Sequence, residues 1–183
     1  MRNYSDLVDR VFRAEHSLGK LTPSETLDWE LSRQIREADD ATLCGGKTPE
    51  HPDLLPVLRG GLFYAVDALD AGHKLFQDAA GDLGSYWHGM IHRREGDFDN
   101  ARYWFRRCGT LGCFAALHRD ASAVSPDMAR QSAWDPYLFT GQCEQARFGA
   151  EELLPELVKL QRLEFAALFD YSWQKAGFAS RTA

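Results

Sequence analysis

The amino-acid sequence predicts an all-α protein of stacked antiparallel helical hairpins, with a long C-terminal helix packing on them. The stretch 86–109 contains two amphipathic segments separated by Gly96-Asp97, and its small residues Gly89 and Ala101 stand where two antiparallel helices have to approach closely. A weaker hairpin precedes it at a fixed offset. No segment alternates apolar and polar residues as a half-buried strand does.

The length and composition favour a single all-helical domain over residues 1–183. Hydrophobic residues make up 44% of the chain and aromatic residues 12%, which is enough to form a core. The apolar runs are far shorter than the roughly 20 residues of a membrane span, so we expect no membrane partner. A net charge of −6 argues against nucleic-acid binding, because phosphate contacts need a basic surface.

The N-terminal sequence and the cysteines predict a cytoplasmic protein. The first ten residues, MRNYSDLVDR, alternate charged with apolar residues and lack the apolar block of a secretory signal. The four cysteines form no Cys-x-x-Cys pair, and their spacing does not suggest an exported disulfide framework. We therefore expect reduced thiols in or near the core.

The first third of the chain predicts two helices and a loop. Ser5 is placed to cap a helix over 6–18, and the sequence TPSE at 22–25 is a capping box with proline at the first helical position. It opens a helix to about residue 38, whose apolar face comprises Leu27, Leu31, Ile35 and Ala38. The run GGKTPEHP predicts a loop over 45–53.

Residues 59–109 contain two degenerate copies of one helical hairpin, offset by 29 residues. Self-similarity of this kind is typical of stacked helical hairpins. The equivalent pairs agree in size and polarity: Gly60 and Gly89, Leu62 and Ile91, Leu69 and Phe98, Asp70 and Asp99, Gly72 and Ala101, Phe76 and Phe105, Ala79 and Cys108.

The last third predicts three more helices. A short one covers about 113–119, a loop covers 122–133, and Asp135-Pro136 opens a helix to about residue 148. The final helix runs from about 154 to 176 and is closed by Gly177, with a disordered tail over 178–183. The chain as a whole is expected to contain about eight helices.

The residues Gly89, Gly96-Asp97-Phe98, Ala101 and Phe105 resemble the second half of a tetratricopeptide motif. The resemblance covers 59–109 and implies a right-handed array of helical hairpins, without assigning binding residues. The longer string 86–107 also resembles an uncharacterised all-helical family of bacteria and fungi, which implies no activity.

A candidate polar cluster lies on the first helix of the second hairpin. His88, His92 and Glu95 follow each other at spacings of four and three, so a continuous helix places them on one stripe. A His-x-x-x-His pair can supply two imidazole nitrogens to a divalent transition metal, and the third ligand then comes from another helix. His73 and Glu164 are the candidates for that ligand.

Glu164 falls at the centre of the apolar face of the final helix, where an unpaired carboxylate is costly. His92, Arg93, Arg94 or a metal ion are possible partners. A hydrogen bond between His92 and Glu164 explains both residues without an ion. A histidine beside a carboxylate also suits general acid–base chemistry, although no serine or cysteine is spaced to complete a nucleophilic triad.

A run of arginines and aromatic residues offers an anion- or partner-binding surface. It comprises Arg93, Arg94, Arg102, Arg106 and Arg107, with Tyr103, Trp104 and Phe105 interleaved. Such residues can grip phosphates and stack bases, but nearby carboxylates can equally absorb the charge in ion pairs. Packing between hairpins is the preferred interpretation of the aromatic residues.

Two functions remain open. We expect a non-catalytic helical scaffold that binds a protein or peptide partner and needs no cofactor, with homodimerisation also allowed. The alternative is a metal-binding helical protein that uses His88, His92 and a third ligand, with hydrolysis as its possible activity. The fold alone does not decide between the two.

Overall fold

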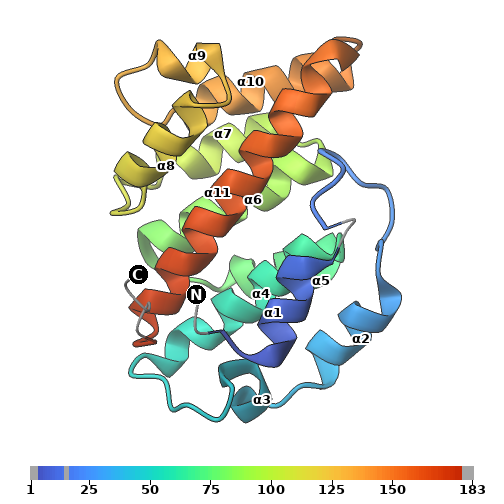
Figure 1. Cartoon of the computed structure of the whole chain (residues 1–183), viewed down its shortest axis with the longest axis vertical. Helices are drawn as coiled ribbons and strands as arrows, with labels where there is room; N and C mark the ends of the chain where they lie inside the picture. Colours follow the sequence, from blue (N-terminus) through green and yellow to red (C-terminus); the bar gives the residue numbers. More distant parts are fainter. Residues whose placement is uncertain (1–3, 15–16, 179–183) are drawn as a thin grey trace.

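The computed structural model of the chain describes residues 4–14 and 17–178, which form eleven α-helices and contain no strand (Figure 1). The helices are α1 (Asp6–Arg13), α2 (Trp29–Glu37), α3 (Asp40–Cys44), α4 (Leu55–Ala65), α5 (Leu69–Gln77), α6 (Gly81–Glu95), α7 (Phe98–Arg106), α8 (Phe114–Ser122), α9 (Pro126–Ala129), α10 (Pro136–Arg147) and α11 (Leu154–Lys175). Two 3₁₀ turns, Pro52–Leu54 and Glu151–Leu153, lead into α4 and α11. Among the described helices, none is long and apolar enough to cross a membrane.

The four helices α4 to α7 form two consecutive hairpins at the centre of the chain. Each packs against the next, so that α5 joins the two hairpins side by side. The turn between α6 and α7 is the one that the sequence predicted: Gly96 has a φ of +82°, and the Asp97 side chain accepts a hydrogen bond from the Asn100 amide at 3.2 Å. Glycine suits this left-handed position because it has no Cβ atom.

One close contact recurs in both hairpins. A Cβ atom placed on Gly60 of α4 would lie 2.6 Å from the ring of Phe76, and one placed on Gly89 of α6 would lie 2.6 Å from the ring of Phe105. These two pairs are equivalent at the 29-residue offset. In each hairpin the absence of a side chain on the first helix lets a phenylalanine of the second helix pack directly against its backbone.

The long helix α11 crosses the hairpins and contacts α4, α8 and α10 (Figure 1). Its contacts reach the buried side of both first helices. The Phe165 ring lies parallel to that of Tyr64 on α4, with 5.9 Å between centroids, and the Ser172 hydroxyl accepts a hydrogen bond from the Trp87 indole of α6 at 3.0 Å. The face that α4 and α6 share is therefore covered by α11.

The N-terminal helices differ from the prediction in their starts and ends. The first one ends at Arg13, and residues 15–16 of its expected range lie outside the described residues. The second begins at Trp29, because the Asp28 carboxylate caps the Leu31 amide at 2.8 Å. The TPSE box at 22–25 is not a helix start, so Leu27 lies outside the helix and is 36% exposed.

Other differences concern short elements that periodicity does not reveal. The helix α3 lies between the expected end of the second helix at about residue 38 and the expected loop 45–53, in residues to which the sequence assigned no element, and α9 lies within the expected loop 122–133. Each begins with a capping side chain, Asp39 and Ser125 respectively. Phe178, the first residue of the expected tail, is buried, with its ring centroid 4.3 Å from that of Trp173. Residues 179–183 lie outside the described residues.

Candidate metal centre

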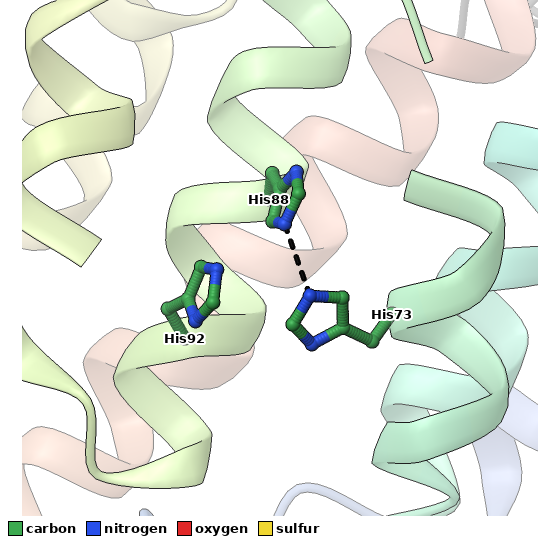
Figure 2. Close-up of side chains that lie close together, drawn as sticks. All are labelled: His73, His88 and His92. Carbon is green, nitrogen blue, oxygen red and sulfur yellow. Dashed lines mark hydrogen bonds between the residues drawn. The ribbon is translucent and has the colours of Figure 1, made fainter. Parts of the chain in front are cut away.

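Three histidines from two neighbouring helices meet between α5 and α6. His88 and His92 project from α6 one turn apart, and His73 reaches toward them from α5 (Figure 2). One ring nitrogen from each lies within 4.8 Å of the others, and the Nε2 atoms of His73 and His88 are 3.1 Å apart. His88 and His92 are buried, whereas the His73 side chain is 27% exposed.

The local sequence explains why α5 lies close enough for this meeting. Gly72, directly before His73, has so little space that an added Cβ would lie 3.0 Å from Ile91 of α6 and 3.1 Å from the Gly60 carbonyl of α4. A larger residue there would push α5 away from both helices. The four-residue spacing of His88 and His92 then places both imidazoles on the side of α6 that α5 faces.

The ring of His88 lies in a stack of planar groups. It is nearly parallel to Trp104 at 4.0 Å and to His92 at 4.8 Å between centroids, and the Arg107 guanidinium lies over the Trp104 ring, 5.4 Å from its centroid. Burial, followed by the neighbouring His92 and His73, lowers the pKa of His88 to about 4. At neutral pH this imidazole is therefore uncharged and keeps a lone pair on one ring nitrogen.

Glu95 holds two of the three rings. Its carboxylate oxygens lie 2.7 Å from Nδ1 of His73 and 3.3 Å from Nδ1 of His92. Burial acts to raise the pKa of Glu95, but the hydrogen bonds with His92 and His73 outweigh it and hold that pKa below its ordinary value. A carboxylate accepts only, so His73 carries its proton on Nδ1 and directs the lone pair of Nε2 toward His88.

Asn100 adds a further contact to His92 from the opposite helix of the hairpin. Its amide nitrogen lies 3.2 Å from Nε2 and 3.4 Å from Nδ1 of that ring. Asn100 and Trp104 both touch the cluster, and the sequence interpretation did not assign either to it. They are four residues apart on α7, a spacing that identifies one helix face, and this was the available signal.

Glu164 is not part of the histidine cluster. Its carboxylate is fully buried on α11, where it accepts hydrogen bonds from both terminal nitrogens of Arg93 and, at 2.7 Å, from the Tyr86 hydroxyl. The Trp134 indole donates in turn to the Tyr86 oxygen at 2.6 Å. Of the partners left open by the sequence, Arg93 is the one found, and the expected hydrogen bond between His92 and Glu164 is wrong.

Arg93 and Arg94 do not belong to a surface, contrary to the expected arginine patch. Arg94 is buried and donates to the Asp67 carboxylate at 2.5 Å, to the Tyr64 carbonyl at 2.6 Å and to the Lys20 carbonyl at 2.8 Å. Burial raises the pKa of Asp67 against the opposing attraction of Arg94. Both arginines hold helices together from inside.

The three remaining arginines lie on α7 or just after it. Arg102 forms ion pairs with Asp99 and with Glu144 of α10, and Arg107 lies over the rings of Tyr103 and Trp104. Arg106 and Arg107 are exposed. The predicted cationic surface is therefore reduced to the outer side of α7, and part of its charge is used in ion pairs.

The four cysteines are free thiols, as expected. Cys44 and Cys143 are buried, whereas Cys108 and Cys113 are half-buried. Burial raises the pKa of Cys108 and of Cys143 to about 12, and that of Cys113 to about 11. None of the four joins the histidine cluster.

Comparisons of the chain with protein-family models, with curated proteins and with solved structures found no match.

Proposed function

We propose that this protein binds one divalent transition metal ion of the zinc class through His73, His88 and His92. The observation that supports the proposal is the convergence of three imidazole nitrogens from two helices within 4.8 Å of one another. Imidazole is the commonest protein ligand for such ions, and zinc sites with three protein ligands leave a fourth position for water or substrate.

The distances suit such an ion after a small movement. Zinc–nitrogen bonds of about 2.0–2.1 Å in a tetrahedral site separate the ligand nitrogens by about 3.4 Å. The Nε2 atoms of His73 and His88 are already 3.1 Å apart. The His92 nitrogen, which lies within 4.8 Å of the others, would have to move inward, at the cost of its contacts with Asn100 and with Glu95.

The surroundings of the rings also favour metal binding. His88 is uncharged at neutral pH, so it loses no net charge when it coordinates an ion. The proton that its Nε2 donates toward His73 would have to move to Nδ1, a buried atom that accepts no hydrogen bond in the ion-free protein. Glu95 accepts from Nδ1 of His73, the arrangement in which a carboxylate fixes the tautomer of a metal-binding histidine and makes its other nitrogen a better ligand.

A peptide-binding scaffold, the function that the sequence favoured, has weaker support. A peptide groove in an array of helical hairpins would lie on the inner, first helices, and α11 covers that face through Phe165 and Ser172. A partner would therefore have to bind another surface of the molecule.

Metal analysis and titration test the proposal. Protein purified without a histidine tag, stripped with a chelator and dialysed, is titrated with Zn²⁺ by calorimetry and with Co²⁺ by absorption spectroscopy. We expect one ion per chain with a Kd below about 1 µM, and the intense visible bands of a four-coordinate cobalt site.

Matched histidine variants distinguish this site from adventitious binding. His73→Ala should abolish stoichiometric binding, whereas His51→Ala, which changes an exposed histidine before α4, should leave it unchanged. Failure of the wild-type protein to bind a stoichiometric ion, or equal binding by His73→Ala, would overturn the proposal.

A further inference from the structure

An open cleft that shares no residue with the histidine cluster lies where α7, α8 and the start of α10 meet. Its volume is about 500 Å³, within the range of small-molecule sites. Five aromatic side chains line it and define the aromatic cleft: Tyr86, Phe105, Phe114, Trp134 and Tyr137. The metal proposal uses none of them.

Three of the rings that line the aromatic cleft pack against one another. Tyr86 and Phe105 are buried, with 5.0 Å between their ring centroids, and the Tyr86 ring lies 5.1 Å from that of Phe114. The Tyr86 hydroxyl is fixed between the Glu164 carboxylate and the Trp134 indole, at 2.7 and 2.6 Å. A site whose rings are already held in place loses little conformational entropy when a ligand enters.

The lining of the aromatic cleft carries no formally charged side chain, although the whole chain has a net charge of −6. The polar groups of the lining include the hydroxyls of Thr110 and Ser132 and the imidazole of His118. The Nε2 atom of His118 forms a hydrogen bond with the Met128 carbonyl at 3.1 Å. Apart from the imidazole of His118, no lining side chain can give an ionic ligand a counter-charge for the hydration that it would lose, whereas a neutral ligand needs none.

Another open cleft of similar size differs from the aromatic cleft in the charge of its lining. Its volume is about 560 Å³, and its lining includes Glu25, Arg36, Asp70 and Glu95. The lack of charge in the aromatic cleft is therefore a property of that place and not of every hollow on this protein.

We propose that the aromatic cleft binds an uncharged, planar aromatic small molecule. Tyr86, Phe105 and Trp134 are buried, so the rings that a ligand can contact are the exposed Tyr137 and the half-buried Phe114, and these favour stacked and edge-to-face contacts. The hydroxyls of Thr110 and Ser132 can supply hydrogen bonds to such a ligand. This site is independent of the metal centre, so either proposal can fail without the other.

The first test uses the unmodified protein and indole as a neutral planar probe. Two alanine methyl groups line the aromatic cleft, those of Ala115 and Ala133, whereas the adjacent Ala116 faces a different cleft beside α11. In methyl NMR spectra, indole should shift the signals of Ala115 and Ala133 in a saturable manner through its ring current. The signal of Ala116 should stay in place.

The second test fills the cleft. Ala115 and Ala116 are exposed neighbours on α8 that line different clefts, so Ala115→Trp fills the aromatic cleft and Ala116→Trp adds the same side chain outside it. Ala115→Trp should weaken indole binding at least about tenfold, and Ala116→Trp should leave it unchanged. Circular dichroism and thermal melting verify that both variants fold.

Several outcomes would overturn the assignment. They are the absence of saturable shifts in the wild-type protein, equal shifts at Ala116, and equal binding by the two tryptophan variants. Equal affinity for cyclohexanol or for naphthalene-2-sulfonate would refute the stated ligand class, because the first is not aromatic and the second is charged.

Discussion

The buried ion pair between Arg93 and Glu164 provides the sharpest test of how this fold is held together. Both side chains are essentially inaccessible, at 1% and 0% exposure, and they connect α6 to α11. Glu164→Gln keeps the size of the side chain and removes its charge. The guanidinium then stays buried without a counter-charge, and the new amide group directs a donor toward the donors of Arg93.

The expected cost follows from the burial of the partner that is left behind. Breaking a buried pair from one side costs about 3–5 kcal/mol, because the remaining charge is uncompensated. The same substitution at Glu144, whose ion pair with Arg102 is partly exposed, should cost at most about 1 kcal/mol. Equilibrium urea unfolding, followed by tryptophan fluorescence, measures both free energies of unfolding.

A double-mutant cycle isolates the pair from the packing of each residue. Arg93→Met and Glu164→Gln should each be strongly destabilising, and the double variant should cost about 2–3 kcal/mol less than their sum, because neither charge then remains. A cost below about 1 kcal/mol for Glu164→Gln, or strict additivity in the cycle, would refute the interpretation of this pair as a buried link between α6 and α11.

Three further predictions use other parts of the molecule. Gly89→Ala should lower the free energy of unfolding by about 1–2 kcal/mol, because the new methyl group would meet the ring of Phe105. Gly141→Ala, which has open space around it, should raise that free energy by up to about 1 kcal/mol. Thermal melting compares the stability of the two variants. Burial raises the pKa of the Cys108 thiol to about 12, so this thiol should react with iodoacetamide at pH 8 far more slowly than a free cysteine does. Its labelling rate should rise about tenfold for each added pH unit. Rapid labelling of Cys108 at pH 7 would contradict the raised pKa. Saturating Zn²⁺ should raise the melting temperature of the wild-type protein but not that of His73→Ala, and equal shifts would indicate binding elsewhere.

The sequence was informative where a signal is local. The turn at Gly96-Asp97 and the helix over Leu154–Lys175 follow from a glycine, a capping side chain and helical periodicity, and the structure contains both. The predicted helix start at 22–25 is wrong for an equally local reason. Asp28 offers a second capping side chain a few residues later, and the helix begins after it. Between two competing caps, tertiary contacts decide.

The site was predictable only in part. Helical spacing placed His88 and His92 on one stripe, and the proximity of His73 followed from the neighbouring hairpin. The partner of Glu164 did not follow, because spacing along α11 does not determine which residue of α6 faces it across the core. Such a choice depends on how two helices rotate about their axes, and this rotation is set by packing across the whole interface.

The last turn of α6 shows why an interpretation based on one polar face failed here. An amphipathic helix is expected to direct its charged residues to water, yet His92, Arg93 and Arg94 are consecutive and all buried. Successive residues of a helix point about 100° apart, so the three side chains leave α6 in different directions. His92 meets α5 and α7, Arg93 meets Glu164 on α11, and Arg94 meets the segment after α4. A polar run can therefore lie in the core when each direction supplies its own partner: the arginines pair with the buried carboxylates of Glu164 and Asp67, and His92 contacts Glu95 and Asn100.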